Sequence, residues 1–338
     1  MKPNQLNAGE VLDILRRGLD CGTMLALDKA FPGLVEHLTH ETVTPRFRNA
    51  SEYKVNTYVM SDDGCGRGIV VKVVPWDSER LVAELSREFV LLGELYSRHP
   101  SSFRIPVAMA LFALDDVFVS VTELLQGDYL TEMELTESRA YVIARTINDI
   151  QHALSDTSTG RTLLVNRQGP YYAKKAHQFI GSVTTDQHVD FGEMDSEFAA
   201  LETIRQTSPV VVSDRSPANF IMCKNCAVGV FDFGLFLAGV PHEDWSLFID
   251  DPRLRTSLTR NELIAIFTGS TNDRHGEGAK EMFHRAAVFV NIKQYCLMVQ
   301  AKRSVAGHYL SRARQSAEAL CLDKIVRLIG TLQSWPTR

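Results

Sequence analysis

Three polar residues in the second half of the chain have types and spacing that suit metal-dependent chemistry. Asn219 lies five positions after Asp214, and Asp232 lies thirteen positions after Asn219. Magnesium prefers hard oxygen ligands and usually keeps phosphate oxygens and water in its coordination shell. Phosphoryl transfer uses such a metal together with a carboxylate that orients the attacking hydroxyl. The three residues together therefore predict phosphoryl-transfer chemistry.

Two apolar runs flank these residues and must position them. Val210–Val212 and Val228–Phe231 predict two short buried strands. Between them Cys223–Ala227, which contains Lys224 and Asn225, predicts the turn of a hairpin. The three polar side chains are then expected at strand ends, where they would point into one cleft.

A lysine and a glutamate nearer the N-terminus are predicted to form a buried ion pair. Lys72 lies in the apolar run Gly68–Val74, which predicts a strand, and a helix predicted over Arg80–Arg98 follows. Glu88 falls within the apolar stripe of that helix, where a carboxylate is costly unless it is paired. Lys72 is its natural partner. The alternatives are a solvent-facing Lys72 and Glu84 as the paired carboxylate.

The central residues carry a resemblance to a known superfamily. The spaced Asp and Asn, followed by Asp-Phe-Gly at Asp232–Gly234, resemble the catalytic and metal-binding loops of the protein-kinase-like superfamily. Ser213–Asn219 is most similar to its small-molecule branch, the aminoglycoside phosphotransferase-like and choline-kinase-like enzymes, whose pattern reads His-Gly-Asp-Leu-His-Pro-Gly-Asn. The chain keeps the Asp, Pro and Asn of that pattern. It departs from the pattern at Val212, Ser213, Arg215, Ser216 and Ala218.

The resemblance, which runs from about Glu41 to about Val299, implies an α+β, two-lobed protein-kinase-like fold. Residues 1–125 are expected to form a small antiparallel-sheet N-lobe with a helix, preceded by a helical extension predicted over Glu10–Phe31. Residues 126–338 are expected to form a larger, mainly helical C-lobe with the catalytic and substrate-binding residues.

The resemblance also implies a role for each of the residues above. Asp214 would orient the acceptor hydroxyl and take its proton. Asn219 and Asp232 would hold Mg²⁺ against the phosphates of ATP. Lys72, steadied by Glu88, would hold the α- and β-phosphates.

Further positions are predicted to contact the nucleotide. In this fold the first strand bend, here Arg48–Glu52, covers the phosphates. Since no glycine occurs between residues 41 and 64, the donors there would be Asn49 and Ser51. The adenine ring would pair with backbone groups just before Gly127, at Glu123 and Leu124.

Two residues are expected to support the catalytic loop. His152, near the end of a helix predicted over Thr136–Leu154, resembles a structural histidine of the superfamily. Asp244 follows Asp-Phe-Gly after a short link and would accept hydrogen bonds from the loop backbone. A protein kinase needs a long activation segment to bind a peptide. The short link therefore favours a small-molecule acceptor.

Composition narrows the class of protein. A net charge of −5, with no Lys/Arg-rich run, argues against nucleic acid as a partner. Six cysteines in 338 residues are too sparse for a disulfide scaffold. No signal-like N-terminus and no long apolar run occur, so a cytoplasmic location without a membrane partner is expected. The sequence favours no oligomeric state.

The sequence thus predicts an ATP- and Mg²⁺-dependent phosphotransferase that acts on a hydroxyl of an aminoglycoside-, amino-alcohol- or natural-product-like small molecule. A catalytically silent nucleotide-binding protein and a protein-kinase-like effector are the alternatives. A run of acidic residues suggests a cationic acceptor, although a solvated acidic surface is the better explanation of such a run. Its members are Asp186, Asp190, Glu193, Asp195 and Glu197.

Overall fold

The computed structural model describes residues 6–18, 43–47, 56–62, 67–98, 100, 102–167, 169–184, 192–223, 227–270 and 276–334. The chain divides into two compact units, each continued by a second segment. The sheet unit comprises Met1–Asp128 and Ile221–Leu235, and the helical unit comprises Tyr129–Phe220 and Phe236–Arg338.

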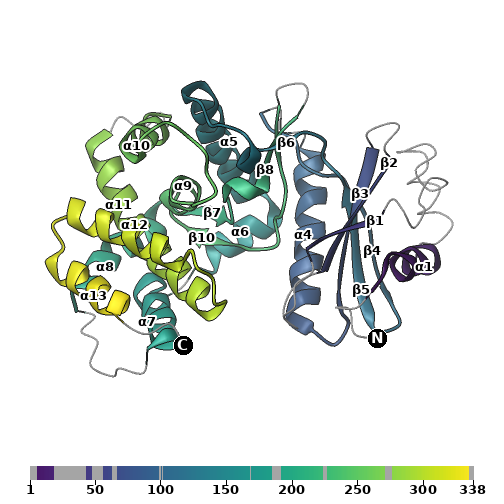
Figure 1. Ribbon diagram of the computed structural model, residues 1–338, viewed down its shortest axis with the longest axis horizontal. Helices are drawn as coiled ribbons and strands as arrows, with labels where there is room; N and C mark the ends of the chain where they lie inside the picture. The colour runs from purple at the N-terminus through teal and green to yellow at the C-terminus, as the bar shows by residue number, and fades with distance from the viewer. Residues whose placement is uncertain are drawn as a thin grey trace. The chain divides into compact units, whose positions relative to one another are not determined.

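The sheet unit is built on a five-stranded antiparallel sheet in the order β1-β2-β3-β5-β4 (Figure 1). Its strands are β1 (Val43–Phe47), β2 (Asn56–Asp62), β3 (Arg67–Pro75), β4 (Ala108–Leu114) and β5 (Val117–Glu123). Among its described residues, two helices accompany the sheet, α1 (Ala8–Gly18) and α4 (Glu79–Ser97). The expected N-terminal helix is therefore described only in its first part, since residues 19–42 lie outside the described residues.

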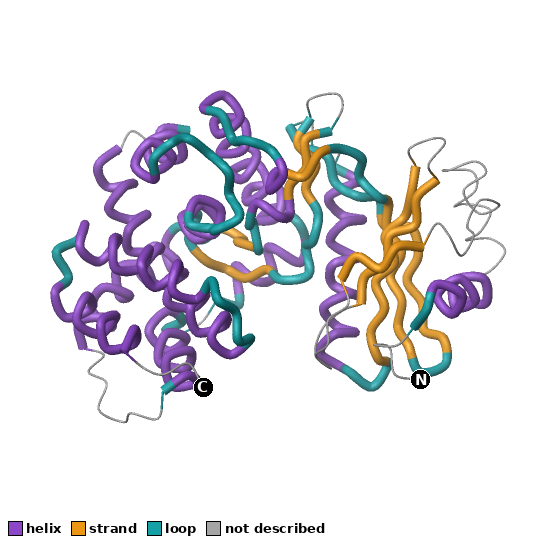
Figure 2. The backbone as a smooth tube through the Cα atoms, viewed as in Figure 1, coloured by secondary structure: helices purple, strands orange, loops and turns teal. Residues whose placement is uncertain are grey.

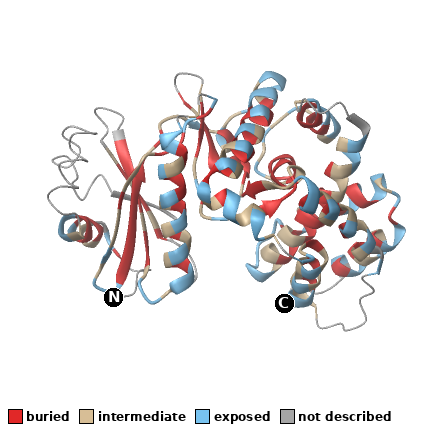
Figure 3. Cartoon of the chain, turned by 180° about the vertical axis from the view of Figure 1, so that it is seen from behind, coloured by how far each residue is buried: buried red, intermediate tan, exposed pale blue. Residues whose placement is uncertain are grey.

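Side-chain alternation along β3 gives the sheet two different faces. Ile69, Val71 and Val73 are fully buried with the apolar stripe of α1. Val74, on the opposite face, packs with Leu81 and Leu85 of α4. The two helices accordingly cover opposite faces of the sheet (Figures 1 and 3). The strand β5 is buried along its whole length. Lys72 has the parity of Val74, which places it on the α4 face.

The predicted hairpin is present, but one of its strands was assigned wrongly. β8 (Phe220–Met222) and β9 (Val228–Val230) are hydrogen-bonded neighbours, and the Cys223 N–H donates to the Ala227 carbonyl at 2.9 Å, while residues 224–226 lie outside the described residues. β7 (Val210–Ser213) instead pairs antiparallel with β10 (Phe236–Gly239). Asp214–Asn219 interrupt the apolar run before the predicted turn, so only the three residues of β8 extend into it.

The helical unit contains most of the helices (Figure 2). They are α5 (Glu137–Asp156), α6 (Ser158–Val165), α7 (Tyr172–Val183), α8 (Gly192–Thr207), α9 (His242–Ile249), α10 (Arg260–Gly269), α11 (Gly276–Gln300), α12 (Ala306–Ala319) and α13 (Asp323–Ser334). Two short elements are β6 (Asp128–Tyr129), where the chain leaves the sheet unit, and the 3₁₀ turn η3 (Leu130–Glu132). A hydrophobic cluster of this unit includes Phe289 of α11, whose ring meets those of Tyr172 and Phe198 edge-on.

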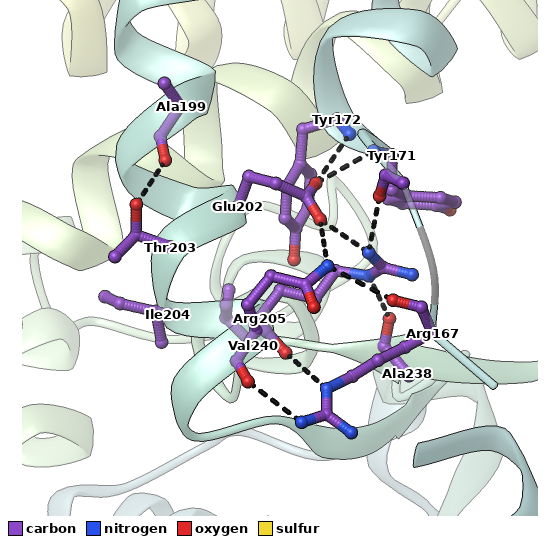
Figure 4. Close-up of polar contacts among 12 residues, drawn as sticks. Arg167, Tyr171, Tyr172, Ala199, Glu202, Thr203, Ile204, Arg205, Ala238 and Val240 are labelled. Carbon is purple, nitrogen blue, oxygen red and sulfur yellow. Dashed lines mark hydrogen bonds and ion pairs between the residues drawn. The ribbon is translucent and has the colours of Figure 1, made fainter. Parts of the chain in front are cut away.

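The buried residue Arg205 links α8 by hydrogen bonds to β10, the strand that follows Asp-Phe-Gly. Arg205 donates from Nε to the Ala238 carbonyl at 3.0 Å and from Nη1 to Glu202 at 2.6 Å (Figure 4). Its Nη1 also reaches the Gly169 carbonyl at 3.3 Å, and its guanidinium lies 5.1 Å from the ring centroid of Tyr171. These bonds satisfy a charge that would otherwise be costly inside the unit. They also fix α8 against β10.

The architecture confirms the predicted fold class, a small antiparallel-sheet part with a helix and a larger, mainly helical part. Among the helices of the described residues, none combines the length and the apolar composition that crossing a bilayer would require.

Candidate active site

In the sheet unit, Lys72 and Glu88 form the ion pair that the sequence predicts. The Lys72 Nζ lies 2.9 and 2.8 Å from the two carboxylate oxygens of Glu88. Glu88 is buried at 4% exposure, and the Lys72 side chain is exposed by 16%. Strand parity and helix phase explain the meeting, since Lys72 and Glu88 both lie between the sheet and α4. Glu84 instead pairs with Arg80 of its own helix.

The same lysine also contacts the first residue of Asp-Phe-Gly. Asp232 Oδ1 lies 3.2 Å from the Lys72 Nζ, and the Phe233 N–H donates to Glu88 Oε1 at 3.0 Å. Asp232 has a φ of 60°, a left-handed conformation that aspartate tolerates better than most residues. Its side chain is half exposed. Lys72, Glu88 and the Asp-Phe-Gly segment therefore form one bonded group.

Charge rather than exposure governs the ionisation of Lys72. Burial lowers the pKa of this ammonium, but the carboxylates of Glu88 and Asp232 outweigh burial and raise the pKa above its ordinary value. Lys72 is therefore a fixed positive charge at neutral pH, held from one side by Glu88.

At the expected adenine-contacting residues, both backbone N–H groups are already used inside the sheet unit. The Glu123 N–H donates to the Val107 carbonyl and the Leu124 N–H donates to the Gly68 carbonyl, each at 2.9 Å. The Glu123 carboxylate pairs with Arg104 at 2.5 Å. Any backbone donor to an adenine would thus have to come from another residue.

Gly127 follows the expected adenine-contacting residues. Its φ is +157°, and a Cβ there would collide with the Met222 carbonyl. This position therefore requires glycine, because the backbone of β8 passes too close for a side chain.

In the helical unit, Asp214 and Asn219 belong to one hydrogen-bonded loop between β7 and β8. The Asn219 Nδ2 donates to the Asp214 carbonyl at 2.7 Å, and the Ser216 N–H donates to Asp214 Oδ1 at 3.3 Å. The loop ends in a 3₁₀ turn, η4 (Pro217–Asn219), which buries Asn219 and leaves Asp214 half-buried. Because the amide nitrogen of Asn219 is bonded within the loop, the amide oxygen is the atom that could bind a cation.

Asp244 accepts a hydrogen bond from the loop, and Gln151 supports it from the other side. Asp244 is fully buried in α9, and its Oδ1 accepts from the Ser213 N–H at 2.9 Å. Gln151 Nε2 donates to Asp244 Oδ2 at 2.9 Å and to the Pro241 carbonyl at 3.0 Å. His152, the residue expected to support the loop, is exposed. The structure places its neighbour Gln151 there instead.

Burial raises the pKa of the Asp244 carboxyl to about 7, against the opposing effect of the nearby Arg215 and of the two donors. Arg215 has no exposed surface. Sequence reasoning treats Arg215 only as a departure from the family pattern, and no sequence signal marks its burial.

Some predicted site residues are not brought into either group. Asn49 and Ser51 lie outside the described residues, as do Asp186 and Asp190. Two further residues of the acidic run have basic partners within the helical unit: Asp195 lies 2.7 Å from His177, and Glu197 pairs with Arg285.

The sequence matches no protein-family model and no curated protein. Solved structures, in contrast, match the fold along most of the chain. Amicoumacin kinase hAmiN, in complex with AMP-PNP, Ca²⁺ and Ami, is 17% identical with a TM-score of 0.60, covering 90% of this chain and 94% of that one. A spectinomycin phosphotransferase, in complex with ADP and spectinomycin, is 11% identical with a TM-score of 0.51, covering 94% and 99%.

A gentamicin complex of the aminoglycoside phosphotransferase APH(2″)-IIa is 18% identical with a TM-score of 0.50, covering 91% of this chain and 98% of that one. At these identities the likeness concerns the fold, and it agrees with the resemblance that Ser213–Asn219 and Asp232–Gly234 carry. The chain has the protein-kinase-like fold of the aminoglycoside phosphotransferase group.

Proposed function

We propose that this protein is an ATP- and Mg²⁺-dependent phosphotransferase that acts on a hydroxyl of a small molecule. The observation that carries the proposal is the bonded group of Lys72, Glu88 and Asp232 in the sheet unit. A lysine that is held by a buried carboxylate and contacts an Asp-Phe-Gly aspartate is suited to bind polyphosphate. The solved structures with this fold include complexes with AMP-PNP and ADP.

The proposed metal ligands have the right donor chemistry. Asp232 offers a half-exposed carboxylate, and Asn219 offers an amide oxygen whose orientation is fixed by its bond to the Asp214 carbonyl. Both are hard oxygen donors of the kind that Mg²⁺ takes beside phosphate oxygens. Bound there, the metal would neutralise charge on the phosphates.

Asp214 is the proposed catalytic carboxylate. It is half-buried on a loop whose backbone is held by Asp244 and Asn219, so its position is restrained before any acceptor binds. A restrained carboxylate can orient a hydroxyl and accept its proton with little reorganisation. Since burial is incomplete, an acceptor can approach it.

The connection after Asp-Phe-Gly favours a small acceptor over a peptide. Only Leu235 separates Gly234 from β10, and only Val240 and Pro241 separate β10 from α9. This connection has no length for an activation segment that would hold a peptide. A protein-kinase-like effector is therefore the weaker alternative.

A cationic acceptor is a second, narrower candidate, motivated by the acidic run. Its support is reduced, because Asp195 and Glu197 are already paired with His177 and Arg285. Reversing Asp190 and Glu193 to lysine tests the idea. A cationic acceptor predicts a raised KM for the acceptor and an unchanged KM for ATP.

The proposal is tested by thermal unfolding with and without Mg²⁺-ATP. A ligand at a hundred times its Kd stabilises a protein by about 2.7 kcal/mol, which a melting curve detects. Lys72→Ala should reduce the shift. Lys72→Arg should not restore turnover, because a planar guanidinium does not replace a compact ammonium. No shift at millimolar Mg²⁺-ATP would refute the nucleotide assignment.

A further inference from the structure

The residues on either side of Asp214 differ from the family pattern, and the structure shows what they do instead. The pattern has glycine before the aspartate and leucine after it, whereas this chain has Ser213 and Arg215. Arg215 is among the largest side chains that are completely buried. Because a buried guanidinium is costly, its retention calls for specific partners.

Ser213 and Arg215 are joined to each other across Asp214. The Arg215 Nε donates to the Ser213 Oγ at 2.6 Å, and the Arg215 N–H donates to the Ser213 carbonyl at 3.1 Å. The backbone bond closes a three-residue turn with Asp214 at its centre. The side-chain bond closes a second ring around the same residue. Two hydrogen bonds thus restrict the backbone that carries the Asp214 carboxylate.

This turn is also attached to α9. The Ser213 N–H donates to Asp244 Oδ1, so Ser213 is held by its backbone to one buried residue and by its hydroxyl to another. The positive charge of Arg215 also opposes the rise that burial causes in the pKa of Asp244, which favours the charged carboxylate. Arg215 therefore acts on the backbone that carries Asp214 in two ways. It bonds the Ser213 hydroxyl, and its charge acts on Asp244, which holds the Ser213 N–H.

We infer that Arg215 is a positioning residue for Asp214, taking over in this chain the support that the missing His-Gly would give. It works through the Ser213 hydroxyl and the Asp244 carboxylate and, being fully buried, touches neither nucleotide nor acceptor. The inference rests on the proposed function, since it assigns Arg215 an effect on turnover.

The chain offers a matched control in Arg205. This arginine is also buried in the helical unit, at 6% exposure, but its guanidinium bonds the carbonyls of Ala238 and Gly169 rather than a residue of the loop around Asp214. Arg205→Leu and Arg215→Leu each remove a buried guanidinium. Only the second removes a bond that spans Asp214.

The test measures Mg²⁺-ATP hydrolysis, with water as the acceptor, and the Kd of Mg²⁺-ATP in each folded variant. Arg215→Leu is expected to lower kcat at least about tenfold and to leave the Kd within about twofold, the signature of a lost transition-state interaction. Arg215→Lys should recover most of kcat. Arg205→Leu, at a comparable loss of Tm, should keep kcat within about twofold of the parent.

Ser213→Ala provides a second, smaller change should Arg215→Leu fail to fold. It should lower kcat in the same direction, and adding Arg215→Leu to it should cost less than in the parent, because both changes break the same bond. Parental kcat in Arg215→Leu or Ser213→Ala would overturn the inference, as would an equal loss in Arg205→Leu. A parent that binds no Mg²⁺-ATP would instead overturn the proposed function.

Discussion

The candidate site residues fall into two halves, one in each unit, that are built in different ways. In the sheet unit, Lys72 and Glu88 are carried by a regular strand and a regular helix, and they meet because strand parity and helix phase aim them at each other. In the helical unit, Asp214 is carried by a loop whose shape depends on Asp244 and Gln151, residues 30 and 63 positions away in the chain. The first half is specified locally and the second by distant contacts.

This difference predicts different sensitivities. The lysine and its carboxylates would act on the nucleotide, so their loss should affect binding and turnover together. The loop would act on the acceptor, so its disturbance should affect turnover while nucleotide binding is kept. Variants of each group can therefore test whether the two groups act on different substrates.

The largest effect is expected from Asp232→Ala. Asp232 contacts Lys72 and is the proposed carboxylate ligand of the metal, so its loss should weaken Mg²⁺-ATP binding and abolish phosphate transfer together. Calorimetric titration of Mg²⁺-ATP and a transfer assay measure the two quantities. Unchanged affinity for Mg²⁺-ATP would show that Asp232 does not contribute to nucleotide binding.

Asp214→Asn should produce a smaller and more selective loss. The isostere keeps the size of the side chain but removes the carboxylate, so turnover should fall by a factor on the order of 10²–10⁴, the usual contribution of a positioned general base. The Kd of Mg²⁺-ATP should remain close to that of the parent. Parental turnover with a genuine acceptor would show that Asp214 is not catalytic.

The locally specified half could be predicted from sequence because two periodicities suffice for it. A lysine in an apolar strand and a glutamate in the apolar stripe of the next helix determine the Lys72–Glu88 pair without knowledge of the rest of the fold. The helix itself agrees within one residue at each end, Arg80–Arg98 predicted against Glu79–Ser97 observed. Their contact with Asp232 is a tertiary result that only the resemblance suggested.

The other half could be predicted only in part. Strand pairing of β7 with β10 depends on register between segments more than twenty residues apart, which no local pattern encodes. Gln151, however, carried a signal, since it lies four positions after Ile147 in the buried stripe of α5, whereas His152 falls outside that stripe. A polar residue in an apolar stripe needs a buried partner, and here the partner is Asp244.

Gln151→Ala should therefore have a clear effect where His152→Ala has almost none. Removing Gln151 leaves the buried Asp244 Oδ2 and the Pro241 carbonyl without this donor, which should lower the free energy of unfolding by about 1–3 kcal/mol and reduce turnover. His152 is exposed, and its removal should change stability by less than about 0.5 kcal/mol. Chemical denaturation of both variants measures the contrast. Equal losses of unfolding free energy in the two variants would show that His152 supports the loop as much as Gln151 does.

A smaller effect than that of Gln151→Ala is expected from His242→Phe, and it appears as a change in pH dependence. Both ring nitrogens of His242 are buried without a hydrogen-bond partner, and burial lowers the pKa of the imidazole to about 4. Between pH 6.5 and 4 the unfolded chain therefore binds a proton that the folded protein does not, so this group reduces stability as the pH falls.

Phenylalanine keeps the edge-on ring contact with Trp245 and removes both nitrogens. The variant should be more stable than the parent at pH 7 by about 1 kcal/mol, because no unpaired polar atoms are buried. Between pH 6.5 and 4 its unfolding free energy should also depend less steeply on pH, because up to about one fewer proton is taken up on unfolding. Denaturant titrations of parent and variant at pH 7 and pH 5 measure both quantities. An unchanged slope would mean that the His242 ring reaches water or a partner in solution, and α9 would then be less tightly packed beside Asp244 than the loop requires.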